Sequence, residues 1–314
     1  MSKHVLITGG LGFIGHNLAR YYLDEGYYVT IVDNLKSHHD HAALTKYRIE
    51  HIDHKKLNFV HLNCNMSYGI IDKLRSSYTR PKTIIHMAEV GDSNLREKDA
   101  YYTTSSLSSN AYSVALLAKE LSAKLIYVST SLAYGSSVLS PQKEDAVATP
   151  DKLYGLLKLN CEMMFKLINP NSVIVRTDCV YGQGDSRMNS ITECIHQMLN
   201  NQEVLVKRYN ENDAIHISDF IRGIKNADDH GVAGEIYNLG YGETRTDNEI
   251  VLIIKMLTNS SSVINYDFDK LMGVNKKGVL DISKAQEHLG FKPKLDIIYG
   301  LRDYIDWIRK YDHL

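Results

Sequence analysis

The sequence predicts an α/β protein in which a doubly wound parallel sheet is followed by a smaller mixed α/β domain. Short apolar segments alternate with segments of helical spacing through residue 177, which indicates parallel strands with helices on both faces of one sheet. A glycine-rich turn separates the first strand from the first helix. The alternation then ends, so we expect one domain over residues 1–177 and a smaller one over residues 178–314. Residues 214–240 are also compatible with packing back on the first domain.

The first strand and the turn after it have the residues of a diphosphate-binding site. Residues 4–7 are a short apolar run of the kind buried on both faces of a sheet, and Gly9, Gly12 and Gly15 follow where a helix begins. The first turn of a helix offers N–H groups and a partial positive charge, and glycine lets a diphosphate approach. The next strand ends in Asp33, close to the roughly 20-residue offset at which an acidic residue accepts from ribose hydroxyls.

Further strands and helices are expected along the chain from their apolar periodicity. In the first domain we expect strands at residues 28–33, 58–62, 83–86, 124–129 and 172–176, and helices at 13–26, 70–78, 99–121 and 151–168. In the second we expect strands at 214–217 and 235–238, and helices at 191–199, 218–227, 247–257, 283–289 and 295–311. Asp151, after Pro150, is expected to cap its helix. Residues 36–56 are expected to be mostly loop with one short helix.

Composition and charge limit the class of protein. A charged fraction of 23% with a formal net charge of −1 gives no electrostatic reason to expect a nucleic acid or an anionic membrane as partner. No apolar run reaches the roughly 18 residues that a transmembrane helix needs. The four cysteines have no metal-ligand spacing, so no metal site is expected, and the thiols are expected to be reduced, as in a cytoplasmic protein.

Tyr154 and Lys158 are the strongest candidates for chemistry. They lie four residues apart in a predicted helix, so they share one face of it. An ammonium beside a phenol stabilises the phenolate and lowers a phenol pKa that is otherwise ~10, as a tyrosine that moves protons near neutral pH requires. This spacing is common by chance, but here it follows the fifth strand of a nucleotide-binding sheet. Thr130, at the end of that strand, is expected to direct its hydroxyl to the same crevice, although a hydroxyl there is also a common turn residue.

These motifs together resemble one known family. The spacing Gly-x-x-Gly-x-x-Gly after Thr8, with Asp33-Asn34-Leu35 ending the second strand, resembles the extended branch of the short-chain dehydrogenase/reductase family, which contains sugar-nucleotide epimerases and dehydratases. The hydroxyl, tyrosine and lysine named above match that family's catalytic set. Residues 280–285 and 289–293 follow its C-terminal pattern. The resemblance implies a Rossmann-type sheet and a C-terminal substrate-binding domain.

The resemblance implies NAD as cofactor and assigns residues to it. Asp33 would repel the 2′-phosphate of NADP, and no arginine stands beside it to offset the repulsion. Asn63 replaces the aspartate usual at its place, and Glu89 stands where a small residue is common, either as a substrate-facing carboxylate or as a surface residue. The implied contacts are Gly9, Gly12, Phe13 and Ile14 with the pyrophosphate, Asp33 and Asn34 with the adenosine ribose, Asn63 with the adenine edge, Met87 and Ala88 beneath the ribose and nicotinamide, and Tyr154 and Lys158 beside them.

The residues after Thr130 favour epimerisation over dehydration. In the 4,6-dehydratases of the family an Asp and a Glu, acid and base for the loss of water, follow the catalytic hydroxyl residue, whereas here Ser131 and Leu132 stand there. Leucine cannot transfer a proton, so reversible hydride transfer without elimination is favoured. Ser131 is then a candidate substrate residue.

Other substrate positions depart from the family pattern. Cys179 occupies the place of a substrate-contacting Asn, and Asn212 that of an Arg that meets the diphosphate. Arg187, Lys207 or Arg208 could replace the missing contact, because a diphosphate favours charge-assisted donors. Each of the three is equally explained as a solvated surface charge.

The resemblance therefore predicts an NAD-dependent epimerase of a nucleoside-diphosphate sugar, acting at carbon 4 and most simply on a UDP-sugar. A keto-sugar-nucleotide reductase or dehydrogenase of the same fold, using NAD(P), is the alternative. A 4,6-dehydratase and a non-catalytic NAD-binding subunit are less favoured. The family also implies a homodimer that packs the helices starting at Asp99 and Asp151.

Overall fold

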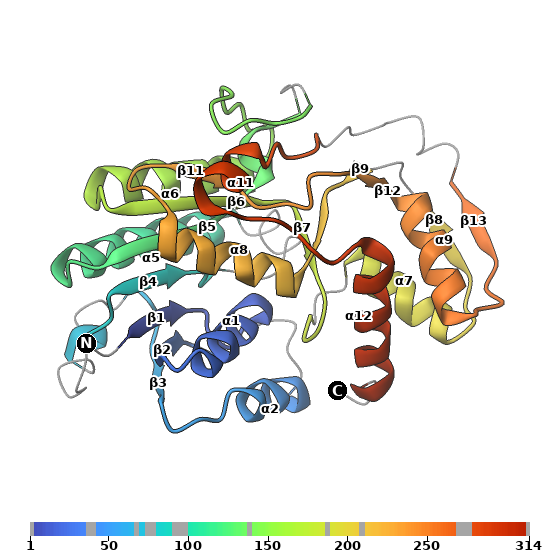
Figure 1. Cartoon of the computed structure of the whole chain (residues 1–314), viewed down its shortest axis with the longest axis horizontal. Helices are drawn as coiled ribbons and strands as arrows, with labels where there is room; N and C mark the ends of the chain where they lie inside the picture. The colour runs from blue at the N-terminus through green and yellow to red at the C-terminus, as the bar shows by residue number, and fades with distance from the viewer. Residues whose placement is uncertain are drawn as a thin grey trace.

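The fold is built on one seven-stranded sheet (Figure 1). The computed structural model describes residues 3–35, 42–65, 69–72, 80–89, 100–136, 140–185, 189–206, 211–267 and 278–311. The sheet has the order β11-β6-β5-β4-β1-β2-β3, and all its neighbouring strands are parallel. The predicted doubly wound parallel sheet is confirmed.

The elements of the sheet and its helical layers follow the predicted order. The strands are β1 (His4–Thr8), β2 (Tyr28–Asp33), β3 (Leu57–His61), β4 (Thr83–His86), β5 (Lys124–Thr130), β6 (Ser172–Thr177) and β11 (Ile236–Asn238). The helices are α1 (Phe13–Asp24), α2 (Ala42–His51), α5 (Ala100–Glu120), α6 (Leu153–Ile168), α8 (Ile217–His230) and α11 (Ser283–Leu289), and one 3-10 turn, η1 (Ser131–Ala133), follows β5.

Alternate residues of a central strand face different hydrophobic cores. In β1, Val5 and Ile7 belong to a core that includes residues of α1 and α8, whereas Leu6 belongs to a core that includes residues of α5 and α6. All three residues are at most 1% exposed. A strand buried on both faces needs apolar residues at successive positions, which explains why the sequence of β1 is a continuous apolar run.

A smaller core lies beside the sheet, among α7 (Ser190–Leu199), α9 (Asp247–Thr258) and α12 (Ile297–Tyr311) (Figure 1). Its centre includes Ile195, Ile254 and Ile305, which are almost completely buried. Three two-stranded pairings accompany these helices. They are β7 (Cys179–Tyr181) with β10 (Ala214–His216), β8 (Val204–Val206) with β13 (Ile264–Tyr266), and β9 (Glu211–Asn212) with β12 (Arg245–Thr246).

Residues 214–240 contribute to both parts of the protein. Their strand β10 pairs with β7, whereas β11 extends the main sheet beside β6. The helix between them, α8, packs against α1, and α11 packs in turn against α8. The C-terminal half of the chain thus adds strand β11 to the main sheet and the helices α8 and α11 to the layer beside it. The domain boundary at residue 177 stays a prediction.

The start of α6 differs from the sequence prediction. The expectation that Asp151 caps this helix is wrong, because α6 begins at Leu153 and its N-cap is Lys152, whose side chain makes no capping hydrogen bond. A Cβ at Gly155 would come within 2.3 Å of the carbonyl oxygen of Leu132, so the first turn of α6 packs directly on the backbone of η1. The helix therefore starts without a side-chain cap and with its first turn in close tertiary contact.

α2 lies in a segment that the sequence assigns mostly to loop. Its inward side includes Arg48, which is 1% exposed. Helix prediction from periodicity looks for apolar residues on the buried face, and an arginine at such a position weakens that pattern. The sequence therefore predicts α2 only as a short helix within a loop. Most of the helix expected at residues 70–78 lies outside the described residues.

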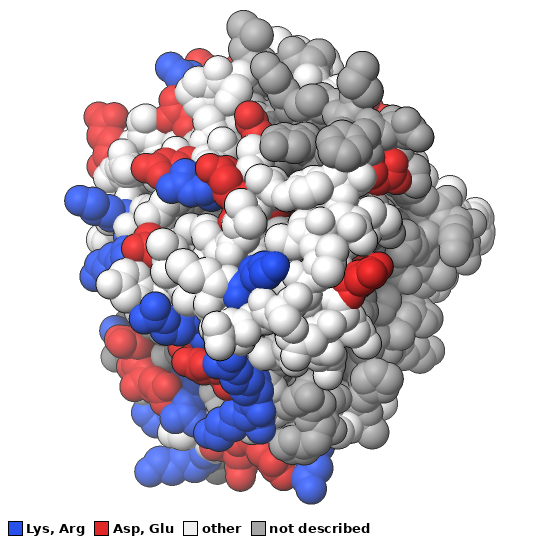
Figure 2. All heavy atoms as spheres, turned by 90° about the vertical axis from the view of Figure 1, so that its right-hand side faces the viewer, with Lys and Arg blue, Asp and Glu red and all other residues white. Residues whose placement is uncertain are grey.

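The face that carries the smaller core has charges of both signs (Figure 2). Where this face is described, Lys and Arg side chains lie among Asp and Glu side chains. Within α12, Arg309 and Asp306 form such a pair of opposite charges. Such a mixture gives that part of the surface no continuous basic stripe of the kind that follows a nucleic-acid backbone. Of the helices described, none combines the length and the apolarity that crossing a bilayer requires.

Two buried histidines predict that the protein loses stability in acid. Burial lowers the pKa of His16 to about 3 and that of His86 to about 4. Both stay neutral in the folded state below pH 6.5, whereas the unfolded chain takes up the protons, so stability present at pH 7 is lost as the pH falls from about 6.5 toward 4. For His86 alone this amounts to about 3 kcal/mol at the acid limit. Urea unfolding at pH 7.5, 5.5 and 4.5 measures the slope.

The variant His86→Asn is the control for this slope. Its amide oxygen can still accept from the Thr8 hydroxyl, which lies 2.7 Å from His86 Nδ1, but it does not titrate. We expect a shallower loss of stability between pH 6.5 and 4.5 than in the wild type. An unchanged slope would show that His86 does not contribute.

Candidate active site

The turn between β1 and α1 leaves a cradle that side chains would fill. Gly9 has a φ of +70°, and a Cβ there would lie 2.9 Å from the backbone of Ala88. A Cβ at Gly15 would lie 2.1 Å from the Gly9 carbonyl oxygen, whereas a Cβ at Gly12 would meet that oxygen at 3.2 Å. Apart from the chain neighbours of Gly12, no other atom of the described residues lies within 4 Å of that Cβ, so the described part of the chain leaves the space in front of Gly12 open. With the N-terminus of a twelve-residue helix behind it, this cradle suits a diphosphate.

The hydroxyl of Thr8 joins the ends of two adjacent strands. It accepts hydrogen bonds from the N–H groups of Met87 at 3.2 Å and Ala88 at 3.3 Å, and donates its proton to Nδ1 of His86 at 2.7 Å. Because β1 and β4 are neighbours, these bonds hold Met87 and Ala88 directly beside Gly9. Two residues expected beneath the nicotinamide thus lie beside the predicted pyrophosphate site.

The ends of β2 and β3 bring together the three residues expected near the adenosine. The Asp33 carboxylate accepts from the N–H of Leu11 at 3.0 Å and from that of Leu35 at 2.9 Å. Asn34 donates its amide to Asn63 Oδ1 at 2.8 Å. Asp33, Asn34 and Asn63 therefore form one polar cluster beside the glycine turn, although their contacts with a dinucleotide stay a prediction.

Arg48 is a structural residue of the site that the sequence did not reveal. Its guanidinium donates to the Leu11 carbonyl at 2.9 Å and to the Gly184 carbonyl at 2.9 Å. It thereby ties the glycine turn to the segment after β7. A lone arginine in a polar stretch carries no pattern that distinguishes it from a surface charge.

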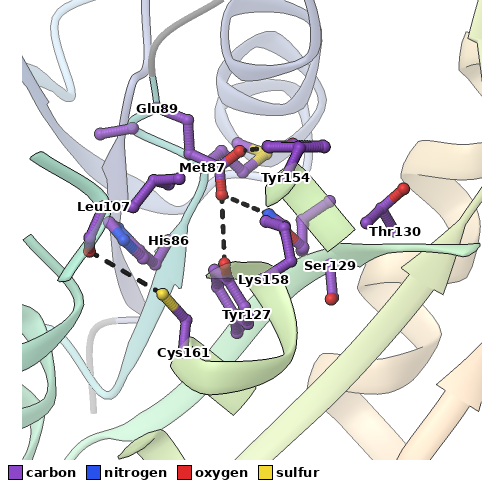
Figure 3. Close-up of polar contacts among 12 residues, drawn as sticks. His86, Met87, Glu89, Leu107, Tyr127, Ser129, Thr130, Tyr154, Lys158 and Cys161 are labelled. Atoms are coloured by element: carbon purple, nitrogen blue, oxygen red, sulfur yellow. Dashed lines mark hydrogen bonds and ion pairs between the residues drawn. The ribbon is translucent and has the colours of Figure 1, made fainter. Parts of the chain in front are cut away.

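Tyr154 and Lys158 share one face of α6, as predicted, and point toward the ends of β4 and β5 (Figure 3). The Lys158 ammonium donates to the Val128 carbonyl of β5 and lies 4.3 Å from the centroid of the Tyr127 ring. Thr130 ends β5, and its hydroxyl accepts from the N–H of Leu132 at 3.3 Å. Thr130 therefore lies at the carboxyl edge of the sheet, where the Lys158 ammonium binds the β5 backbone two residues before it.

Glu89 lies at the centre of this group (Figure 3). Its Oε2 accepts the Tyr154 hydroxyl at 2.8 Å, and its Oε1 accepts both the Lys158 ammonium and, at 3.2 Å, the Tyr127 hydroxyl. Its side chain is 12% exposed and that of Lys158 is 2% exposed. Of the two alternatives left open by the sequence, a surface residue is therefore excluded. One indication of this role is visible in the sequence: Glu89 is an acidic residue at a position where the resembled family commonly has a small one.

The predicted substrate residues are only partly described. Ser131 is buried and donates its hydroxyl to Asp178 Oδ1 at 2.7 Å. Cys179 is partly buried and begins β7 next to the end of β6. Arg187 and Arg208, like Lys207, lie outside the described residues. The assignment of these positions to a substrate stays a prediction.

Comparison with known proteins identifies the family. Residues 5–240 match the model of the NAD dependent epimerase/dehydratase family. The chain belongs to this family. The family is NAD-dependent, and the cradle at Gly12, the acidic end of β2 and the Tyr154–Lys158 face are features that fit such a dinucleotide.

Several family members resemble the chain to nearly the same degree. A UDP-N-acetyl-alpha-D-glucosaminuronate decarboxylase of Bacillus cytotoxicus is 27% identical over 100% of both chains. A putative UDP-glucose 4-epimerase of Methanocaldococcus jannaschii is 26% identical over 97% of this chain and 98% of that one. A dTDP-4-dehydro-6-deoxyglucose reductase of Escherichia coli is 26% identical over 97% of both chains. The identities do not distinguish among three reactions.

Solved structures of the family share the fold. A UDP-glucuronic acid 4-epimerase from Bacillus cereus, in complex with UDP-glucuronic acid and NAD, has a TM-score of 0.86 and 24% identity over 98% of this chain and 99% of that one. A dTDP-glucose 4,6-dehydratase from Streptomyces venezuelae, with NAD bound, has a TM-score of 0.85 and 23% identity over 99% and 98%. The predicted Rossmann-type fold is confirmed, and the choice of reaction has to be argued from the site.

Two glycines of the turn predict opposite outcomes for the same substitution. In Gly12→Ala the methyl group enters open space in front of the turn, so we expect a Tm within about 2 °C of the wild type and at least tenfold weaker NAD binding. In Gly15→Ala the methyl overlaps a backbone oxygen, so we expect a loss of about 3 kcal/mol in the free energy of unfolding. Thermal unfolding and calorimetric titration with NAD measure the two effects. Equal losses of Tm in both variants would contradict the assignment.

Proposed function

We propose that the protein is an NAD-dependent epimerase that acts at carbon 4 of a nucleoside-diphosphate sugar, with a UDP-sugar as the substrate. One observation carries the proposal: Tyr154 and Lys158 share a face of α6 beside the end of β5, the strand that Thr130 ends, and Leu132 stands where a dehydratase of the resembled family has a proton-transferring carboxylate. The UDP-sugar relatives and neighbours support the substrate class.

In this proposal the residues around the glycine turn hold the cofactor. The pyrophosphate would lie at the N-terminus of α1 in front of Gly12, and the adenosine ribose would lie at the end of β2 beside Asp33. Met87 and Ala88, fixed by the Thr8 hydroxyl, would lie beneath the nicotinamide. When bound, NAD accepts a hydride from the sugar and returns it.

The residues of α6 and β5 then handle the proton and orient the sugar. The Thr130 hydroxyl and Tyr154 would hydrogen-bond the hydroxyl at carbon 4, and Tyr154 would pass on the proton of that hydroxyl. The buried Lys158 ammonium supplies the positive charge beside them. Leu132 offers no proton donor or acceptor, so water is not eliminated. The keto-sugar can then turn and receive the hydride on its other face.

Substrate contacts are assigned by position. Ser131 and Cys179 would line the sugar pocket, and Arg187 and Arg208 would contact the diphosphate. Cationic donors suit a diphosphate because charge-assisted hydrogen bonds are the stronger ones.

A keto-sugar-nucleotide reductase is the second candidate, and one finding favours it. The Escherichia coli relative with a reductase name matches the chain over the same share and at the same identity as the relative named as an epimerase. The two reactions differ in net redox change. A reductase consumes one NAD(P)H for each sugar reduced, whereas an epimerase returns its cofactor to the starting state in each cycle.

We further propose that the protein is a homodimer that packs α5 and α6 of two copies together. These two helices pack against each other within the chain, and their outer sides expose apolar residues. Apolar side chains gathered on one surface favour association. The most exposed of them are Tyr101 (85%), Tyr112 (53%), Met163 (64%) and Leu167 (84%).

The epimerase proposal predicts interconversion of two UDP-sugars without a net change of absorbance at 340 nm. We expect the purified protein with NAD to convert UDP-glucose, UDP-galactose or a UDP-uronic acid to its 4-epimer, as followed by NMR of the sugar. Tyr154→Phe should lower kcat by about 10³-fold, because the proton carrier is lost. Tyr299→Phe, at an exposed tyrosine of α12, is the matched control. Stoichiometric consumption of NADH would instead establish the reductase.

The homodimer predicts that charges on α6 separate the subunits. We expect the double variant Met163→Glu and Leu167→Glu to raise the dimer dissociation constant by about 100-fold, because carboxylates must be desolvated in the interface. Light scattering coupled to gel filtration measures the mass. Leu252→Glu, at a half-exposed leucine of α9, should leave the mass unchanged. A wild type that is monomeric at all concentrations refutes the proposal.

A further inference from the structure

We propose that Glu89 is the resting proton acceptor of this site and acts through Tyr154. In this arrangement the Tyr154 phenol is held neutral with its proton directed at the Glu89 carboxylate, and Lys158 neutralises that carboxylate. The proposal rests on the proposed function, because the proton that it moves comes from the sugar hydroxyl. It replaces a phenolate base by a relay of two residues.

Three side chains hold both oxygens of Glu89 in place (Figure 3). Tyr154 donates to Oε2 at 2.8 Å, while Lys158 and Tyr127 donate to Oε1 from the other side. Because the two members of the ion pair are 12% and 2% exposed, water and salt screen their charges little. The carboxylate is therefore a fixed part of the site rather than a mobile surface group.

The charges of the group decide where the proton resides. A hydrogen bond of 2.8 Å between Tyr154 and Glu89 needs a proton on one of the two oxygens, since two anions at this distance repel each other. A carboxylic acid ordinarily ionises near pH ~4 and a phenol near ~10, so the carboxylate is the anion and the phenol keeps the proton. The positive charge of Lys158 is paired with the negative charge of Glu89. It therefore does not stabilise a second negative charge on Tyr154.

Four further titratable groups of the described residues interact electrostatically with Glu89, and all four are uncharged at neutral pH. These groups lie on β4, β5 and α6 and in the segment after β3. Within the part of the chain that the structure describes, Lys158 is the cation that pairs with Glu89. Burial lowers the pKa of His86 on β4 to about 4, raises that of Cys64 after β3 to about 12 and that of Cys161 on α6 to about 11, and raises the pKa of Tyr127 on β5 well above its usual value.

The relay consists of two coupled proton transfers, which together carry one positive charge from the sugar hydroxyl to Glu89. The O–H bond of the sugar breaks and its proton bonds to the Tyr154 oxygen, while the Tyr154 O–H bond breaks and that proton bonds to Glu89 Oε2. The hydride leaves the same sugar carbon for the bound dinucleotide of the proposed function, so the alcohol loses two electrons as hydride and one proton. When the hydride returns, both proton transfers reverse, and Glu89 is again a carboxylate.

The variant Glu89→Gln tests the relay with two measurements. In NAD-free protein, 13C NMR of tyrosine labelled at Cζ follows the ionisation of Tyr154, whose signal is the one missing in Tyr154→Phe. We expect Tyr154 to ionise at least about one pH unit lower in Glu89→Gln, because a neighbouring negative charge is removed. We also expect the acidic limb of the kcat profile to move to higher pH and kcat at pH 7 to fall about 10²-fold, because the phenolate must now form first.

Opposite shifts of the two midpoints distinguish the relay from a structural role. If Tyr154 phenolate is itself the base in the wild type, both midpoints move to lower pH together and the proposal is overturned. An unmoved NMR midpoint also overturns it. Glu144→Gln is the control, because that partly buried glutamate accepts from the Asn238 N–H and should leave both midpoints unchanged. Glu89→Ala should repeat the opposite shifts if the glutamine variant folds poorly.

Failure of the relay and failure of the proposed function are separable. The NMR midpoint needs neither NAD nor sugar. A stoichiometric change at 340 nm refutes the epimerase. The alkaline limb is then measured in the reduction, because that direction needs a protonated donor, and a limb that moves to higher pH in Glu89→Gln while the NMR midpoint falls supports the relay. Epimerisation with midpoints that fall together refutes the relay and leaves the epimerase standing.

Discussion

The site depends on one close backbone contact, between the first turn of α1 and the carbonyl of Gly9. A side chain at Gly15 would begin 2.1 Å from that oxygen, so only a hydrogen atom fits there. α1 therefore starts directly against the end of β1, at the edge where parallel strands of such a sheet bind ligands. The ends of β2, β4 and β5 bring further site residues to the same edge, and α6 adds Tyr154 and Lys158.

From that contact outward, polar groups connect the strand ends. Thr8 accepts from the N–H groups of Met87 and Ala88, and the next residue, Glu89, reaches the hydroxyl of Tyr154. Lys158 donates to both Glu89 and the Val128 carbonyl, so one buried ammonium joins α6 to the ends of β4 and β5. A buried charge of this kind is stable only when it is paired and hydrogen-bonded, which gives the network its rigidity.

The family keeps this frame while the reaction varies. Relatives named as a decarboxylase, an epimerase and a reductase match the chain almost equally well, so overall likeness says little about the reaction. The residues that our proposals invoke for the reaction lie at the edge of the sheet. At that edge this chain has a leucine, Leu132, in the turn after β5, and a carboxylate, Glu89, paired with Lys158 and bonded to Tyr154.

The sequence by itself determined the sheet, the glycine turn and the common face of Tyr154 and Lys158, because strand and helix periodicity and turn glycines are local properties. Only the tertiary structure decided the position of Glu89, whose partner Tyr154 is 65 residues away, and the burial of Arg48, which lies 136 residues from Gly184. It also showed that α6 begins at Leu153 without a cap at Asp151 and packs Gly155 on the backbone of Leu132. Such contacts depend on which strand ends lie side by side, and no local pattern encodes that order.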